Sequence, residues 1–320
     1  MAAWAPRARS LHVLLLALPL YGVSRGVPAD GTGLWLRVVA ASLLLFLPGA
    51  LVARALAVRG ASAAVGWTLA TLSLGLVVVF TFHTSIWIAL VVVAAVGLGA
   101  LPFSVRGVAA PASLPTLIVA LGGLAFGVAL WHVAGVVNGD ALFHLGRVRK
   151  LDAFGSLHLR TVDEFVDGGL HPGYAFPLWH GFLALVAKLA GVDSTQVVLH
   201  EPSAVAPVAF AVVYEAGLAL FRSVWLGVAV LVATVAAAAL APGHGGSFAL
   251  LAQPGTIDRY VLASATLAVF FLAVREPTWQ RLATHRASSL RRSSAGWGED
   301  ATGRTGRMRA GSVPAARAAP

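Results

Sequence analysis

The sequence predicts an all-α polytopic membrane protein with about eight transmembrane helices and one long extracytoplasmic loop of amphipathic juxtamembrane helices. Three observations predict this class. Hydrophobic residues make up 58% of the 320 residues and charged residues only 11%, whereas about a quarter of a soluble domain is charged. Apolar runs recur at close to the ~20 residues that a spanning helix needs. Arginines fall on alternate connections between these runs.

The first 137 residues form an N-terminal membrane region with five predicted helices. The first helix is short, contains Pro19, and follows Arg7 and Arg9 in the manner of a secretory signal. Because no convincing small-x-small cleavage site follows it and further spans come after, we expect an uncleaved helix. The five predicted spans are about 11–28, 34–57, 61–82, 85–103 and 115–137.

The cations between these helices predict their orientation, because Lys and Arg are enriched on the cytoplasmic side. Arg25 lies on the opposite side and disagrees with the pattern. The cations on alternate connections are Arg7, Arg9, Arg54, Arg59 and Arg106. The N-terminus is therefore expected in the cytoplasm, and five crossings bring the chain to the extracytoplasmic face at about residue 138.

Residues 138–196 form the predicted extracytoplasmic loop with interfacial helices. The loop is rich in carboxylates and imidazoles, and its aromatic side chains argue against disorder. Between about 140 and 154, apolar residues recur at steps of three and four, which predicts a helix whose one apolar face lies on the bilayer. These apolar residues are Leu142, Leu145, Val148, Leu151 and Phe154.

The apolar segment of about 176–190 is short for a span. If it crossed, the arginine-rich end of the chain would lie outside, so the positive-inside rule favours an interfacial or re-entrant piece. A second membrane region, 197–277, then holds three helices at about 197–221, 224–241 and 258–274. Residues 278–320 are expected to be a disordered, basic cytoplasmic tail. The localisation predicted is the plasma membrane, with both termini in the cytoplasm.

Composition excludes several classes of function. Because there is no cysteine, neither disulfides nor thiolate metal sites are available. A net charge of +10 can indicate nucleic acid, but in so apolar a chain cytoplasmic cations and contact with anionic lipid explain it better. The expected partner is therefore the lipid bilayer and not nucleic acid. Gly122-Gly123 lacks a P-loop or dinucleotide-binding context and receives no nucleotide role.

Asp140 is the candidate catalytic residue, because it stands where a long apolar segment ends at the membrane surface. A carboxylate there can accept a proton from an acceptor hydroxyl. The alternative is that Asp140 caps the N-terminus of the following helix. His144 lies one helical turn further on, where it would orient the carboxylate, touch phosphate or help bind a divalent cation. A metal site made of this pair alone would be incomplete, and an interfacial histidine without such a role is the alternative.

Three cations, Arg147, Arg149 and Lys150, follow on the same predicted helix. They suit a phosphate or pyrophosphate group, to which arginine offers two parallel hydrogen bonds. Cations on an extracytoplasmic loop oppose the usual distribution, which favours a functional cause. Attraction to anionic lipid is the alternative.

Five further polar residues lie in or near predicted membrane segments, where their presence needs an explanation. His171 and His180 flank a run rich in proline and aromatic residues and are candidates for lining a substrate site. Asp258 and Arg259 open the last predicted helix at the outer surface, where a local ion pair is the default interpretation. Glu215 lies inside a predicted span, where carboxylates are rare, and we expect it to snorkel or to form an ion pair near the inner surface.

Three runs in this order resemble a known family. They are NGDALFHLGRVRKL from residue 138, HPGYAFPLWHGFLALVAKLAGVD from residue 171, and an apolar helix ending in AGLALF before Arg222. The order is similar to that of the GT-C superfamily of membrane glycosyltransferases, in the protein-mannosyltransferase-like branch common in actinobacteria. The matching positions, within about 137–275, are Asp140, His171 to His180, Gly191 and Arg222.

The resemblance implies an enzyme that takes a sugar from a polyprenyl-phosphate donor on the extracytoplasmic side and passes it to an acceptor. Asp140 would act as the base, and Asp258 and Arg259 would face the lipid phosphate. The chain departs from the pattern, because about five helices precede the loop and few follow it. Two alternatives therefore stay open: a multi-pass transporter or lipid flippase, and a truncated, non-catalytic membrane subunit. A transporter typically has polar residues near mid-bilayer and repeated halves, which this sequence lacks.

Overall fold

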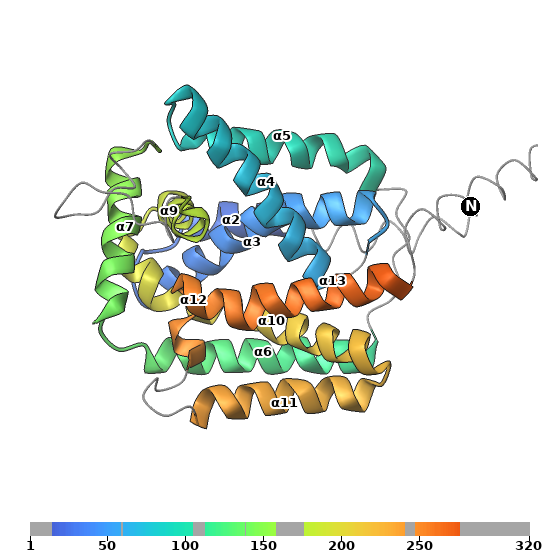
Figure 1. The fold of residues 1–320 in the computed structure, drawn as a ribbon. Coiled ribbons are helices and arrows are strands. Elements are labelled where there is room, and N and C mark those ends of the chain that lie inside the picture. The colour runs from blue at the N-terminus through green and yellow to red at the C-terminus, as the bar shows by residue number, and fades with distance from the viewer. Residues whose placement is uncertain are drawn as a thin grey trace, which may run out of the picture. The chain divides into compact units, whose positions relative to one another are not determined.

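The computed structural model describes residues 15–58, 60–104, 113–137, 139–157, 176–240 and 247–275. These residues are helical and contain no β-sheet, only an isolated antiparallel bridge between Ser85 and Ser156. The helices, labelled in Figure 1, are α2 (Ala17–Arg25), α3 (Gly31–Ala55), α4 (Ala61–Phe82), α5 (Trp87–Ser104), α6 (Leu114–Val133), α7 (Asp140–Phe154), α9 (Leu178–Ala190), α10 (Ser194–Phe221) and α11 (Val224–Leu240). A 3₁₀ turn (Ser247–Leu250) precedes the continuous series α12 (Pro254–Ile257), η3 (Asp258–Leu262) and α13 (Ala263–Arg275).

Six helical segments in the described residues are long and apolar enough to cross a membrane. They are α3, α4, α5, α6, α10 and the series from Pro254 to Arg275. The prediction of a multi-pass, all-helical membrane protein is confirmed. Within the described residues, two of the eight predicted spans do not reach this length: α2 has nine residues, and α11 has 17. At about 1.5 Å per residue α11 extends about 26 Å, slightly less than the ~30 Å hydrocarbon core.

Contacts between distant helix ends agree with the predicted alternation of the spans. The last turn of α3 and the end of α5 lie together, because Arg54 Nε donates to the Ser104 carbonyl over 2.7 Å. At the opposite end, the α4–α5 turn meets the end of α7, where Ile86 N donates to the Gly155 carbonyl over 2.7 Å. The bundle therefore has two ends that collect the connections as predicted.

Arg25, which disagrees with the charge pattern, has an intramolecular role. Its guanidinium donates to the carbonyls of Leu189 and Ala190, over 3.2 and 2.5 Å, at the C-terminus of α9. Arg37 joins it there, with a bond of 3.3 Å to the Ala190 carbonyl. The last carbonyls of a helix lack partners within the helix and carry partial negative charge, so they need such donors. Arg25 therefore stabilises the end of α9.

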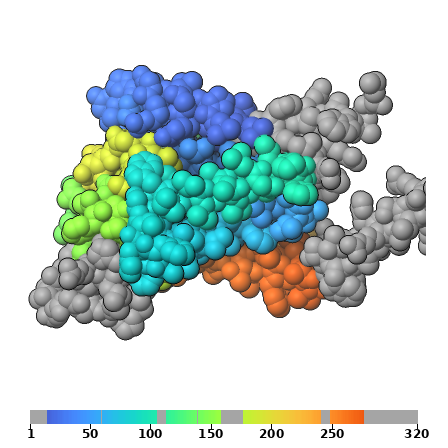
Figure 2. Space-filling model, turned by 90° about the horizontal axis from the view of Figure 1, so that it is seen from above, coloured from blue at the N-terminus to red at the C-terminus, as the bar shows by residue number. Residues whose placement is uncertain are grey.

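Two helices do not run with the others. Figure 1 shows α7 crossing one end of the long helices and α9 viewed end-on beside it. Figure 2, turned by 90°, again places the green α7 and the yellow region of α9 and the start of α10 together at one end of the bundle. The bounds of α7 match the prediction, and α9, with 13 residues, lies across the spans as a re-entrant or interfacial piece would.

The apolar face of α7 points in a direction that differs from the prediction. Leu145, Val148 and Leu151 are buried in the protein core, whereas Leu142 and Phe154 remain exposed. A helix beside α9 and α10 can bury its apolar side chains against them, so this face packs on protein instead of on the bilayer. Both α7 and α9 end at a glycine with positive φ, Gly155 at 59° and Gly191 at 64°, the usual end of a helix.

The packing of α6 on α10 depends on two glycines four residues apart. A Cβ atom at Gly123 would lie 2.7 Å from Pro207 Cα, and one at Gly127 would lie 2.4 Å from the Ser203 carbonyl oxygen. Small residues at this spacing let two helix backbones approach closely in a membrane. Gly123 and Gly127 therefore serve helix packing.

Candidate functional site at the α7–α9 end of the bundle

The candidate site is a cavity of about 370 Å³ between the start of α9 and the α12–η3 turn. The residues that line it include two aromatic ones, Phe176 and Trp179, together with His180 and Asp258. Trp179 is held in place because its Nε1 donates to the Ala252 carbonyl over 3.0 Å. The structure thus brings together two of the predicted site residues, His180 and Asp258, which are 78 positions apart in the sequence.

Behind the cavity wall, His180 forms a buried pair with His144 of α7. The Nδ1 atom of His144 lies 3.1 Å from Nε2 of His180, and the two residues are 6% and 1% exposed. Burial lowers the pKa of His180 to about 3, an effect to which the charges of His144 and Arg147 add. Burial also lowers the pKa of His144, against the opposing charge of Asp140. Both imidazoles are therefore neutral at pH 7, and one donates a hydrogen bond to the other.

Asp140 is the first residue of α7 and its side chain is exposed. Gly139, which has no side chain, occupies the N-cap position, so the capping alternative for Asp140 does not apply. A carboxylate in the first turn still interacts favourably with the helix dipole. Its charge reaches His144 one turn later, where it opposes the effect of burial. Asp140 and the histidine pair therefore belong to one electrostatic unit at the start of α7.

The three predicted phosphate-binding cations do not share one face of α7. Arg147 is 3% exposed, and its guanidinium lies 4.8 Å from the centroid of the Phe143 ring. Arg149 points the other way, donating to Asp193 over 3.2 Å and to Thr195 over 2.6 Å. Lys150 is half-buried. Residues two apart on a helix point in nearly opposite directions, which separates Arg147 from Arg149.

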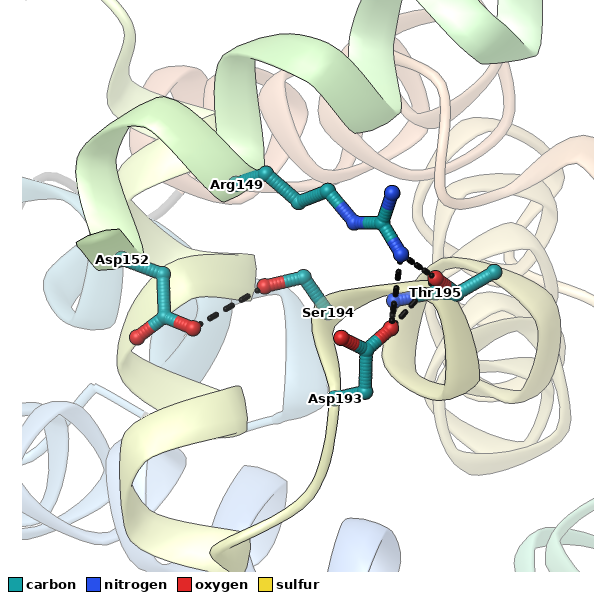
Figure 3. A network of polar contacts seen from close by, with 5 residues as sticks. All are labelled: Arg149, Asp152, Asp193, Ser194 and Thr195. Carbon is teal, nitrogen blue, oxygen red and sulfur yellow. Dashed lines mark hydrogen bonds and ion pairs between the residues drawn. The ribbon is translucent and has the colours of Figure 1, made fainter.

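Figure 3 shows the network that Arg149 enters at the turn between α9 and α10. Asp193 caps α10 by accepting from Thr195 N over 2.8 Å. Hydrogen bonds from Thr195, with a smaller contribution from Arg149, lower the pKa of Asp193. Nearby, Asp152 accepts from Ser194 over 3.2 Å and forms an ion pair of 3.0 Å with Lys188. These bonds join α7 to the α9–α10 turn and hold α7 across the bundle.

Asp258 and Arg259 lie in η3, a wide helical turn between α12 and α13. Both are exposed, and the described residues include no ion pair between them, so the default interpretation of a local pair does not hold. Wide turns inside a helix are often found at functional sites. Here the turn directs Asp258 to the cavity.

The remaining site predictions give two results. His171 lies outside the described residues, so its role as a lining residue stays a prediction. Within the described part of the chain, no group of three or more His, Asp and Glu side chains comes close enough to hold a metal ion. The divalent cation considered for Asp140 and His144 therefore gains no further ligand from these residues.

Sequence reasoning missed Glu201. This residue lies in α10, inside a segment long enough to span the membrane, and is 0% exposed. Its carboxyl group contacts the hydroxyl of Ser42 on α3, at 2.9 and 3.0 Å. The sequence did contain a signal for Glu201, because a glutamate inside a predicted span marks a functional position by default. The same signal drew attention to Glu215 only.

Glu215 has a different partner from the one expected. Its carboxylate accepts from the backbone N–H groups of Ala61 and Ser62, over 2.7 and 2.8 Å, and from the Ser62 hydroxyl over 2.7 Å. These groups form the N-terminus of α4, where backbone donors lack partners within the helix. Glu215 therefore caps α4 from α10, in place of the predicted snorkelling or ion pair.

Comparison of the chain with family models, with curated proteins and with solved structures finds no match in any of the three.

Proposed function

We propose that the protein is an integral membrane glycosyltransferase that moves a sugar from a polyprenyl-phosphate donor to an acceptor at the extracytoplasmic face. The cavity between α9 and η3 carries this proposal. Its volume of about 370 Å³ falls within the range of small-molecule sites. It lies at the end of the spans, beside a helix that crosses them, where a lipid-linked donor would present its headgroup.

The wall of the cavity suits a sugar. Trp179 and Phe176 provide apolar ring faces, and Asp258 provides a carboxylate that can accept hydrogen bonds from hydroxyl groups. His180 also lines the cavity, and its buried imidazole pairs with His144, which supports the wall from behind. A few polar groups in a mostly apolar wall fix the orientation of a ligand.

Asp140 is the proposed general base. Its exposed carboxylate is free of a capping bond and lies one helical turn from His144. A base must reach the acceptor hydroxyl through a hydrogen bond, and an exposed carboxylate at the end of the bundle is open to an acceptor from outside. Arg259 would face the phosphate of the donor from η3. The lipid chain of the donor would lie in the surrounding bilayer.

The test supplies membranes containing the protein with a labelled polyprenyl-phosphate sugar and a mixture of acceptors. Asp140→Asn is expected to lower transfer about 100-fold or more, the usual contribution of a general base. Asp258→Asn is expected to weaken binding of the sugar. Asp30→Asn is the matched control, because Asp30 is also exposed at a helix start and makes no capping bond. Equal transfer by Asp140→Asn and Asp30→Asn would exclude Asp140 as the base.

A transporter or flippase is the second candidate, and Glu201 is the observation that favours it. A buried carboxyl group inside a spanning helix, beside Pro202, suits a transporter, whose polar residues typically lie near mid-bilayer. Solute movement into vesicles without sugar transfer would select this function. Absence of both activities would select the non-catalytic subunit.

A further inference from the structure

Glu201 lies deep in the helical bundle and is separate from the cavity. It is the eighth residue of α10, about 10 Å along the helix axis from its start. The residue is 0% exposed, and its hydrogen-bond partner is the Ser42 hydroxyl. Ser42 is itself 2% exposed. Water therefore does not reach this contact in the structure.

The contacts of Ser42 need one more donor hydrogen than Ser42 and an ionised Glu201 supply. Ser42 Oγ lies 2.9 Å from the Val38 carbonyl oxygen, 2.9 Å from Glu201 Oε1 and 3.0 Å from Oε2. A serine hydroxyl has one hydrogen to donate, yet all three of these neighbours are acceptors when Glu201 is ionised. A proton on Glu201 removes the conflict. The acid then donates to Ser42 Oγ, and Ser42 donates to Val38.

Among the described residues, no charged or titratable side chain on the surrounding helices donates a hydrogen bond to Glu201. His200, the neighbour of Glu201 on α10, lies against Trp131 of α6 at a centroid distance of 3.9 Å, and its buried Nδ1 has no hydrogen-bond partner among the described residues. Arg37 of α3 donates to the carbonyls of Val27 and Ala190. His180 of α9 pairs with His144 of α7. An ionised Glu201 would thus be a buried charge with one donor, an arrangement that costs several kcal/mol.

Glu215 provides an internal comparison on the same helix. Three donors reach its carboxyl group, two from the backbone and one from Ser62, all within 2.8 Å. That set of donors suits a carboxylate, which only accepts. Glu201 has one hydroxyl that is shared with Val38. The two carboxyl groups of α10 therefore differ in the number of donors they receive.

We propose that Glu201 is a proton-binding site inside the membrane, held as a neutral carboxylic acid that donates to Ser42 and joins α10 to α3. The ligand of this site is the proton. Loss of the proton leaves a buried carboxylate with a single donor between α10 and α3, so the protonated state is the favoured one. This proposal does not depend on sugar transfer, and it holds whether the protein is an enzyme or a transporter.

Infrared spectroscopy of the full chain, reconstituted in lipid and labelled with ¹³C-glutamate, tests the proposal. At pH 7 we expect a carbonyl band of a protonated carboxylic acid that shifts with the label. Glu201→Gln should remove this band, and Ser42→Ala should move its frequency because the acid loses its acceptor. Glu215→Gln, the matched control, should leave the band in place. A band that survives in Glu201→Gln, or a wild-type protein without the band at pH 7, would overturn the proposal.

Stability provides a second measurement if a spectrum is difficult to assign. Glutamine has the shape of a neutral glutamic acid and can donate to Ser42 through its amide, so Glu201→Gln should keep the wild-type unfolding midpoint. Glu201→Ala should lower the midpoint, because it removes the hydrogen bond to Ser42 and leaves a cavity. If Glu201→Gln lowers the unfolding midpoint as much as Glu201→Ala does, Glu201 is not protonated in the folded protein.

Discussion

Replacing Gly127 by alanine tests the close approach of α6 and α10. The new Cβ would lie 2.4 Å from the carbonyl oxygen of Ser203, and a backbone atom cannot swing aside as a side chain can. The helices must therefore separate or shift. Gly122 is the matched control, because a Cβ there meets nothing within 4 Å. Both substitutions lie in the interior of the same helix.

The magnitude follows from two opposing contributions. Alanine favours a helix interior over glycine by about 1 kcal/mol, and this gain is common to both variants. Forcing an extra carbon into a tightly packed contact costs about 1–3 kcal/mol, and this cost applies to Gly127→Ala alone. The difference between the variants is therefore about 2 kcal/mol, or roughly a 30-fold change in the unfolding equilibrium. Gly122→Ala should be neutral or slightly stabilising.

The assay is reversible unfolding in mixed micelles with increasing sodium dodecyl sulfate, followed by far-ultraviolet circular dichroism. Gly127→Ala should unfold at a lower detergent fraction than Gly122→Ala, with an unchanged folded spectrum before the transition. If the two variants unfold at the same detergent fraction, α6 and α10 do not approach each other at Gly127, and the argument for packing through small residues fails.

Three other predictions concern the α7–α9 end and the helix caps. The pKa of His180 falls from 6.5 to about 3 on folding, so its contribution to stability is present above pH 6.5 and is lost as the pH falls. This loss is about 2 kcal/mol at pH 5. A His180→Gln variant that keeps His144 should therefore show a flatter dependence of thermal stability on pH. Glu215→Gln should cost about 1–2 kcal/mol, because one cap acceptor is replaced by a donor; an unchanged melting temperature would exclude the cap. Asp193→Ala should destabilise by about 1 kcal/mol through loss of the α10 cap, whereas Arg149→Ala, in an exposed pair, should cost less than 1 kcal/mol; equal melting temperatures would contradict this ranking.

The membrane class and the bounds of α7 were predictable because they depend on local features. Apolar runs of spanning length and the spacing of Leu145, Val148 and Leu151 belong to single segments. The end of α7 at Gly155 follows from the freedom of glycine to adopt a positive φ. The side of the membrane that each connection faces stays a prediction from the positions of the cations.

The direction in which a helix faces was less predictable. A spanning helix is apolar toward lipid and toward the core alike, so hydropathy does not indicate which side meets a neighbour. The face of α7 with Leu145 was therefore assigned to the bilayer, although it packs on protein. Glu215 was expected to snorkel or to form an ion pair, because the N-terminus of α4 that it caps lies 153 positions away in the sequence.

The sequence by itself determined that this is a multi-pass helical membrane protein with a short helix, Asp140–Phe154, after its fifth predicted span. Only the tertiary structure decided that His180 meets His144, that Asp258 shares a cavity with His180, and that Glu201 meets Ser42. The reason is physical. Composition and periodicity fix what a segment becomes, whereas polar partners far apart in the chain meet only when the rotation and packing of each helix are set.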